Sequence, residues 1–237
     1  MDNESIINMN SLIKSGLLNQ SNYMYFDQKN GFGEHKPLAI ELLKKTVSIL
    51  DEFNINYFLI SGTLLGYVRH NDFIPWDDDI DLIVDKTILE KLPLIYSKYK
   101  SDLIFINREN FLIKLCSRKG IEVNNKHINR YVINPYDKYK WPFIDLFIYD
   151  YNSPELQSKP QIQHQTNIIK FFDKKWLANY FFPCKTVDFL GCHVKIPNNP
   201  DYFLRINFGN DYMTTLKSNK YNHRQEIPNG KVKEIKK

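Results

Sequence analysis

"SGTLLGYVRHNDFIPWDDDIDLIV", residues 61–84, places five aspartates in and before a run of large apolar residues. Burying an unpaired carboxylate beside such a run is costly. In an extended strand successive side chains point to opposite faces, so Asp77, Asp79 and Asp81 share one face and Asp78 points to the other. Carboxylates on one face repel one another unless a cation lies between them. The pattern favours a metal site, with a solvated acidic turn as the alternative.

A second apolar strand carries one more carboxylate. Asp145 stands in "PFIDLFIY", residues 142–149, between apolar neighbours. A single aspartate in a strand can be an edge residue or a hydrogen-bonded core residue, but two strands with inward carboxylates can hold an ion between them. Hard divalent cations prefer carboxylate oxygens. We therefore predict that Asp79, Asp81 and Asp145 bind Mg²⁺, or Mn²⁺, and are the catalytic residues.

A glycine turn precedes the aspartates. The stretch "ISGTLLG" is typical of a strand end, a glycine and the first turn of a helix that begins at Gly62 or Thr63. Backbone N–H groups at a helix start favour phosphate, and glycine allows close approach. We predict that Gly62, Thr63, Arg69 and Asp77 contact the substrate or its phosphates, with Asp77 as an auxiliary metal ligand. For Arg69 an ion pair with a nearby aspartate is an equal alternative.

The rest of the chain alternates helical and strand patterns, which predicts an α/β (α+β) fold: a mixed β-sheet flanked by helices in a single domain. We expect a loosely structured arm over residues 1–35, the domain over 36–230 and a frayed tail over 231–237. The expected helices are 37–53, from 62 or 63 to 70, 86–99 with a kink or break at Pro93, 161–180 and 200–208. The expected strands are 56–61, 79–84, 102–107, 111–117, 129–134, 142–150 and 185–197.

Composition narrows the function class. The chain has 237 residues, of which 43% are apolar, so it can bury a sizeable core. The net charge of +5 suits an anionic substrate but is too small for a dedicated nucleic-acid binder. Three cysteines without paired spacing argue against a disulfide framework. No signal peptide or apolar run long enough to span a bilayer is visible, so we expect a cytoplasmic protein without a transmembrane segment.

An aromatic and basic stretch over residues 130–141 has several interpretations. Tyr131, Tyr136, Tyr139 and Trp141 alternate with arginine and lysine. They could form a pocket for the acceptor or for a choline-type cation, or a strip that stacks nucleic-acid bases. In a chain with 14% aromatic residues, most of them can equally be core.

Residues 57–85 resemble the signature of the LicD/fukutin family. "GTLLGYVRHNDFIPWDDDIDL" is similar to the family's run of glycine turn, Arg-His, Pro-Trp-Asp and Asp-x-Asp. "FIDLFIYD" resembles its later strand with the third metal carboxylate, and "VKIPNNPDYFLRINFGNDYMT" its C-terminal run, although Asn207-Phe208-Gly209 stands where Tyr-Gly is common. In outline the resemblance covers residues 38–215.

The resemblance implies a DNA polymerase β-type nucleotidyltransferase fold and a metal-dependent transfer. A phospho-alcohol group, of the phosphocholine or ribitol phosphate type, would pass from a CDP-linked donor to a glycan or glycoconjugate hydroxyl. Asp145 is then also the candidate general base. Two alternatives stay open: a glycosyltransferase that uses Asp-x-Asp for a nucleotide-sugar, and a non-catalytic nucleotide-binding module. The sequence does not choose the transferred alcohol, the acceptor, the number of ions or the oligomeric state.

Overall fold

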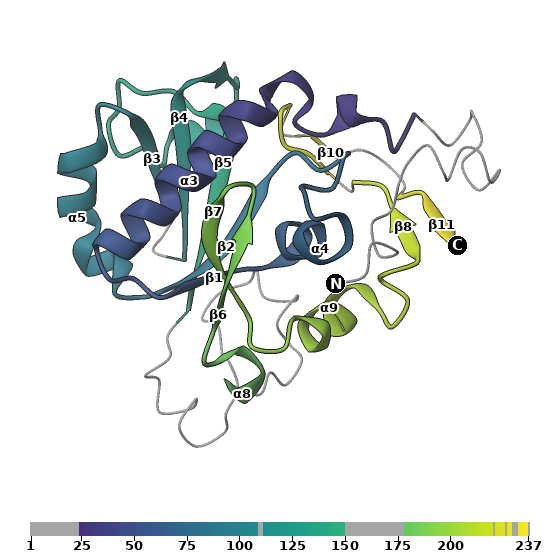
Figure 1. Cartoon of the computed structure of the whole chain (residues 1–237). Coiled ribbons are helices and arrows are strands. Elements are labelled where there is room, and N and C mark those ends of the chain that lie inside the picture. The colour runs from purple at the N-terminus through teal and green to yellow at the C-terminus, as the bar shows by residue number, and fades with distance from the viewer. Residues whose placement is uncertain are drawn as a thin grey trace.

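A five-stranded mixed sheet lies at the centre of the computed structural model, which describes residues 24–108, 111–149, 178–219, 221–225, 227–228 and 232–236. The strand order is β1-β2-β5-β4-β3 (Figure 1). β2 and β5 are parallel, and the other neighbours are antiparallel. The strands are β1 Tyr57–Leu59, β2 Ile80–Asp85, β3 Leu103–Arg108, β4 Leu112–Glu122 and β5 Lys140–Tyr149. The expected mixed sheet is confirmed.

Helices flank this sheet, as expected. In α3, apolar residues recur at helical spacing and pack against β4 and β5, and a proline stands in the first turn. α4 follows β1 after one residue and contacts β2 and α9 (Figure 1). Pro93 lies inside α5 without dividing it. The longer helices are α3 Lys36–Glu52, α4 Ser61–His70, α5 Ile88–Tyr99 and α9 Pro200–Phe208.

Shorter elements complete the described part of the chain. The hairpin of β6 and β7 packs on β1, and two small strand pairs follow α9. These elements are η2 Gln28–Asn30, η3 Gly33–His35, α6 Lys126–Asn129, α8 Ala178–Phe181, β6 Lys185–Phe189, β7 Cys192–Ile196, β8 Thr215–Lys217, β9 Tyr221–Asn222, β10 Ile227–Pro228 and β11 Glu234–Lys236.

The strand register places charged residues in one row across the sheet. Asp81 on β2 is level with Asp145 on the parallel strand β5, and Asp145 is opposite Lys114 on β4. Leu82, Ile83 and Val84, which follow Asp81 on β2, are completely buried. A strand buried on both faces shows an apolar run rather than an alternating pattern, as this one does. The charged row therefore lies at the edge of the apolar core.

Three expectations about elements are revised. Residues 129–134 were expected as a strand, but Asn129 ends α6, and pairing with β3 is limited to the bridge between Val132 and Ile106 and the backbone hydrogen bonds on either side of it. In the tail, residues 234–236 pair with β8 and are not frayed. In the N-terminal arm Phe26 and Phe32 are buried in the core. The expected helix over 161–180 lies outside the described residues, apart from its end in α8.

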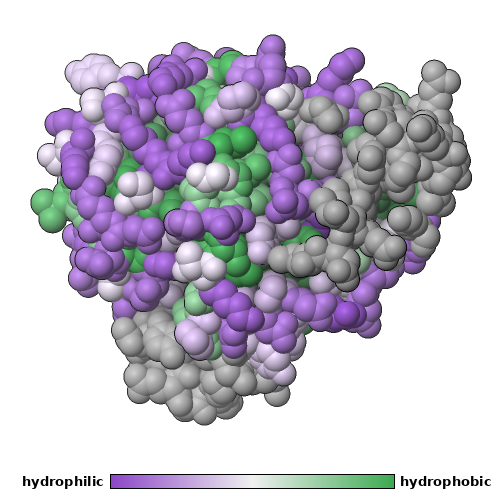
Figure 2. All heavy atoms as spheres, viewed as in Figure 1, coloured by the Kyte–Doolittle hydropathy of each residue, from purple (hydrophilic) through white to green (hydrophobic). Residues whose placement is uncertain are grey.

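The visible surface is mostly hydrophilic. In the view of Figure 1, polar and charged residues cover most of the described surface, with small apolar patches between them (Figure 2). None of the helices that the structure describes is both long enough and apolar enough to pass through a lipid bilayer.

Candidate metal centre and substrate cavity

The site begins at the turn from β1 into α4. Ser61 adopts a left-handed backbone conformation with φ of +50°, and α4 starts there. Within the described residues no side chain caps this helix end. A Cβ atom on Gly62 would lie 2.2 Å from Oδ2 of Asp77, so glycine makes room for that carboxylate beside the first helical turn. The positive end of α4 therefore faces Asp77.

Thr63 has a different place from the one predicted. Its side chain is buried, and its Oγ1 accepts a hydrogen bond from the backbone N–H of Asp81 at 2.8 Å. Among the described residues that line the cavity, Ser61 and Gly62 are present and Thr63 is absent. Thr63 thus joins α4 to the start of β2 and positions Asp81.

Two glycines of α4 allow a direct test of this arrangement. At Gly66 a Cβ would lie 2.6 Å from the backbone oxygen of Asp72, which cannot move alone, whereas at Gly62 it meets only the end of a side chain. We expect Gly66→Ala to lower the free energy of unfolding by about 1–3 kcal/mol. Gly62→Ala should lower it by less than about 1 kcal/mol, because alanine also favours the helix. Urea unfolding of both variants measures this, and equal losses would contradict the placement of Asp77.

Three carboxylates converge as predicted. One oxygen each from Asp79, Asp81 and Asp145 lies within 4.8 Å of the others. Burial, and then the charges of Asp79 and Asp145, raise the pKa of Asp81 well above its ordinary value. Burial and the neighbouring aspartates Asp79 and Asp78 do the same for the pKa of Asp77. Without a bound cation, this arrangement penalises ionisation of its own carboxylates.

The donor set fits a hard divalent cation. All three groups of the cluster are carboxylates, the ligands that Mg²⁺ and Mn²⁺ prefer. Nζ of Lys114 lies 2.8 Å from Oδ1 of Asp145, so a cation bound here would share this carboxylate with a buried lysine.

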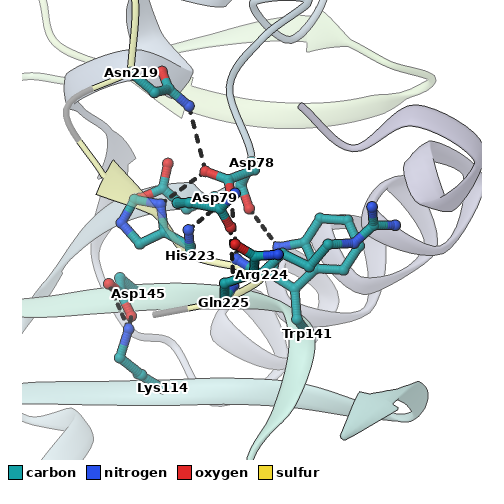
Figure 3. A network of polar contacts seen from close by, with 10 residues as sticks. Asp78, Asp79, Lys114, Trp141, Asp145, Asn219, His223, Arg224 and Gln225 are labelled. Atoms are coloured by element: carbon teal, nitrogen blue, oxygen red, sulfur yellow. Dashed lines mark hydrogen bonds and ion pairs between the residues drawn. The ribbon is translucent and has the colours of Figure 1, made fainter. Parts of the chain in front are cut away.

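Lys114 is a site residue that sequence reasoning missed. Its Nζ lies 2.8 Å and 3.0 Å from the two carboxylate oxygens of Asp145, and 3.7 Å from the centre of the Phe143 ring (Figure 3). The side chain of Lys114 is 5% exposed and that of Asp145 is 9% exposed. Burial raises the pKa of Asp145, and the charge of Lys114 partly offsets this. A lysine inside the apolar run "FLIKLC" was the available signal.

A second missed contribution comes from residues 219 and 221–225, here called the C-terminal strap. Nδ1 of His223 lies 2.8 Å from Oδ1 of Asp78, and Nε2 lies 3.3 Å from Oδ2 of Asp79 (Figure 3). Burial alone would lower the pKa of His223, but the charges of Asp79 and Asp78 and the hydrogen bond to Asp78 raise it to about 10. Strand alternation placed Asp78 on the opposite face from Asp79, but residues 77–79 precede β2 and both carboxylates contact His223.

Arg69 follows neither of the two interpretations directly. Its Nη1 donates hydrogen bonds to the backbone oxygens of Tyr212 at 2.8 Å and Thr215 at 3.0 Å, and its Nε donates to Nε2 of His70 at 3.0 Å. Burial lowers the pKa of Arg69 to about 10, so it stays charged at neutral pH. Arg69 touches the cavity, yet these contacts join α4 to the segment after α9. A phosphate contact for Arg69 stays a prediction.

The carboxylates open into a cavity of about 580 Å³. Apolar and aromatic side chains from α9 and the C-terminal residues form much of its wall. Of the interpretations of the stretch over 130–141, the core one holds for Tyr139 and Trp141, which are completely buried, whereas Tyr136 is 91% exposed. The described aromatic residues that line the cavity are Trp76, Phe147, Phe203, Phe208, Tyr212 and Tyr221.

Comparison with known proteins agrees with the resemblance read from residues 57–85. An uncharacterized protein of Rickettsia typhi is 32% identical over 109 residues, which are 45% of this chain and 35% of that protein. Lipopolysaccharide cholinephosphotransferase LicD of Haemophilus influenzae is 25% identical over 148 residues, 61% of this chain and 55% of LicD. Human ribitol 5-phosphate transferase FKRP is 42% identical over 50 residues, 19% of this chain and 10% of FKRP.

The match to the first two relatives spans 35% and 55% of their lengths. The profile of a single family, described as LicD/FKTN/FKRP, nucleotidyltransferase domain, matches residues 54–199 and so covers more than half of the chain. The matched region contains the glycine turn and all three clustered aspartates. The chain therefore belongs to the LicD/FKTN/FKRP family of nucleotidyltransferase domains.

Proposed function

We propose that this chain is a metal-dependent phosphotransferase that moves a phospho-alcohol group from a CDP-linked donor to a glycan hydroxyl. Family membership supports the reaction class, because the named relatives are a cholinephosphotransferase and a ribitol 5-phosphate transferase. The observation that carries the proposal is the convergence of the carboxylates of Asp79, Asp81 and Asp145 on a cavity.

Asp79, Asp81 and Asp145 would hold the divalent cation. When bound, Mg²⁺ or Mn²⁺ would neutralise the charge of the diphosphate and of the leaving nucleotide. Thr63 fixes the backbone of Asp81, and Lys114 fixes the carboxylate of Asp145. We favour the ligand role of Asp145 over its predicted role as general base, because one of its oxygens lies within 4.8 Å of oxygens of both Asp79 and Asp81.

The transfer forms one bond and breaks one. The acceptor hydroxyl oxygen attacks the phosphorus that carries the alcohol, and the bond from that phosphorus to the bridging oxygen breaks. CMP leaves with that oxygen, and the hydroxyl proton passes to a base. The cavity wall of apolar residues such as Phe147 and Phe203 would exclude water, which would otherwise compete as the acceptor.

A donor-binding panel tests the proposal. Calorimetry should detect binding of CDP-choline or CDP-ribitol in the presence of Mg²⁺, and about 10-fold or weaker binding after the cation is chelated, because the carboxylates then repel the diphosphate. Addition of an acceptor glycan should release CMP. UDP-glucose is the comparison for nucleotide-sugars, since it differs in both the base and the transferred group.

Three outcomes would contradict the proposal. If chelator left donor binding unchanged, the proposed metal dependence would be contradicted. If only UDP-sugars were bound, a glycosyltransferase would be favoured. If Asp79→Asn and Asp81→Asn left ligand affinity unchanged and wild-type protein released no CMP, a non-catalytic module would be the better description.

A further inference from the structure

The buried guanidinium of Arg69 donates its three hydrogen bonds to neutral acceptors. Nη1 donates to the backbone oxygens of Tyr212 at 2.8 Å and Thr215 at 3.0 Å. Nε donates to Nε2 of His70 at 3.0 Å, so that ring nitrogen carries no hydrogen. Burial, and then the charge of Arg69, lower the pKa of His70 to about 3, which keeps the ring neutral. These contacts hold the plane of the guanidinium but supply no negative charge.

Nη2 is the nitrogen of Arg69 that these contacts leave unused. It carries two hydrogens, and among the described residues no acceptor contacts it. Arg69 is 2% exposed and lines the cavity. Nη2 is not one of the described polar atoms that are sealed from solvent without a partner, so it is reached from the cavity. Two N–H groups of fixed direction are therefore open to a ligand in the cavity.

The positive charge of Arg69 also lacks a partner in contact. A guanidinium stays charged at neutral pH, and a buried charge is costly unless an opposite charge compensates it. The charge of Asp77 acts on Arg69 through space, but no carboxylate in the described part of the chain forms an ion pair with it. Arg118 shows the usual arrangement, since its two Nη atoms each lie 2.7 Å from an oxygen of Asp137. An anion in the cavity would give Arg69 what Arg118 already has.

The other basic residues of the cavity are already paired. The basic residues among its described lining are Arg69, Lys217 and His223. Lys217 lies 3.6 Å from Glu234 and is 44% exposed. The ring nitrogens of His223 lie 2.8 Å from Asp78 and 3.3 Å from Asp79. Arg69 is therefore the cation of this lining that has no carboxylate partner.

We propose that Arg69 is a substrate-contacting residue, whose Nη2 donates hydrogen bonds to a phosphate-type oxyanion that enters the cavity beside the carboxylate cluster. The planar donors of arginine match the spacing of phosphate oxygens. The inference rests on the proposed function for the source of the oxyanion, which is the diphosphate of the donor or an anionic group of the acceptor glycan.

Two substitutions at residue 69 separate the charge from the free nitrogen. Arg69→Lys keeps a positive charge that can still donate to the backbone oxygens of Tyr212 and Thr215, but it has no group in the place of Nη2. Arg69→Gln removes both the charge and Nη2. Arg118→Lys is the matched control, because Arg118 is an arginine outside this cavity whose guanidinium is occupied by Asp137.

Calorimetry with inorganic phosphate in the presence of Mg²⁺ measures the contact. Wild-type protein should bind phosphate, and Arg69→Gln should bind it about 10- to 100-fold more weakly, the effect of one charged hydrogen bond. Arg69→Lys should lie between these two affinities. Arg118→Lys should bind phosphate as wild type does.

A second measurement on wild-type protein covers the case in which Arg69→Gln does not fold. The ¹⁵N NMR signals of the arginine Nε–H groups can be assigned from the spectra of Arg69→Lys and Arg118→Lys. Addition of phosphate should shift the signal of Arg69 and leave that of Arg118 in place, because the anion contacts one guanidinium and not the other.

Competition with CDP-choline identifies the source of the oxyanion. If phosphate and CDP-choline exclude each other, the oxyanion belongs to the donor, and Arg69→Lys should weaken binding of the donor as well. If the two bind together, the oxyanion belongs to the acceptor, and Arg69→Lys should leave the affinity for CDP-choline unchanged.

Three results would overturn the contact. Wild-type affinity for phosphate in Arg69→Gln would mean that Mg²⁺ alone holds the anion. Equal losses in Arg69→Gln and Arg118→Lys would assign the effect to the net charge of the protein. Absence of phosphate binding by wild type, with an unmoved Arg69 signal, would exclude the subsite. Arg69-dependent binding of phosphate without CMP release from any CDP-alcohol would refute the proposed function and leave this inference standing.

Discussion

Lys114→Met is expected to lower the free energy of unfolding of the metal-free protein by about 3–5 kcal/mol, the usual result of removing one partner of a buried ion pair. The substitution keeps the length of the side chain but leaves the Asp145 carboxylate buried without its counter-charge. Asp145 would then face Asp79 and Asp81 alone. Urea unfolding at pH 7 in the presence of chelator measures the loss.

A double variant and a surface control make this prediction specific. Adding Asp145→Leu should recover most of the stability, because an apolar pair of similar volume replaces a buried ion pair well. Lys119→Met is the matched control on the same strand: Lys119 pairs with Glu41 at 2.7 Å but is 71% exposed. An exposed pair contributes less than about 1 kcal/mol. A loss in Lys114→Met no larger than in Lys119→Met would contradict the buried counter-ion.

Asp81→Asn is expected to separate stability from activity. Because the folded-state pKa of Asp81 is raised, its ionisation costs stability as the pH rises above the unfolded-state value. Asparagine removes that cost, so the metal-free variant should be more stable than wild type at pH 7. It also removes one ligand, so CMP release should fall by about 10³-fold or more.

The comparison needs urea unfolding with chelator and CMP release with Mg²⁺ on the same preparations. Asp85→Asn is the matched control at the other end of β2, where the side-chain oxygen that accepts from the N–H of Thr87 is retained. Asp85→Asn should change the rate of CMP release by less than about 3-fold and the free energy of unfolding by less than about 0.5 kcal/mol. Reduced stability of Asp81→Asn would contradict mutual repulsion in the cluster, and retained CMP release would contradict its metal role.

The parts of the site that were predictable depend on local patterns. Strand alternation and the apolar runs around Asp79, Asp81 and Asp145 were enough to bring the three carboxylates together. The same reasoning assigned Thr63 to phosphate, because a sequence does not show that its hydroxyl binds the Asp81 backbone. The strand over 129–134 was only partly right, since Asn129 belongs to the short helix α6 and only Val132 forms a bridge with β3.

The unpredicted parts depend on tertiary contacts. Lys114 could have been found, because a charged residue inside an apolar strand requires a partner, and Asp145 was already a candidate. His223 carries no such signal, since it lies in a polar stretch, "NKYNHRQ", without helical or strand periodicity. Its role follows only from its contact with Asp78, 145 residues earlier in the chain.

The distance between Asp78 and His223 along the chain affects the order in which the parts of the site are synthesised. The sheet strands and all three clustered aspartates are translated by residue 149, whereas His223 follows far behind. A nascent chain thus contains all three clustered carboxylates before His223 is synthesised. A polypeptide that ended between these points would carry the carboxylate cluster and lack the imidazole that contacts Asp78.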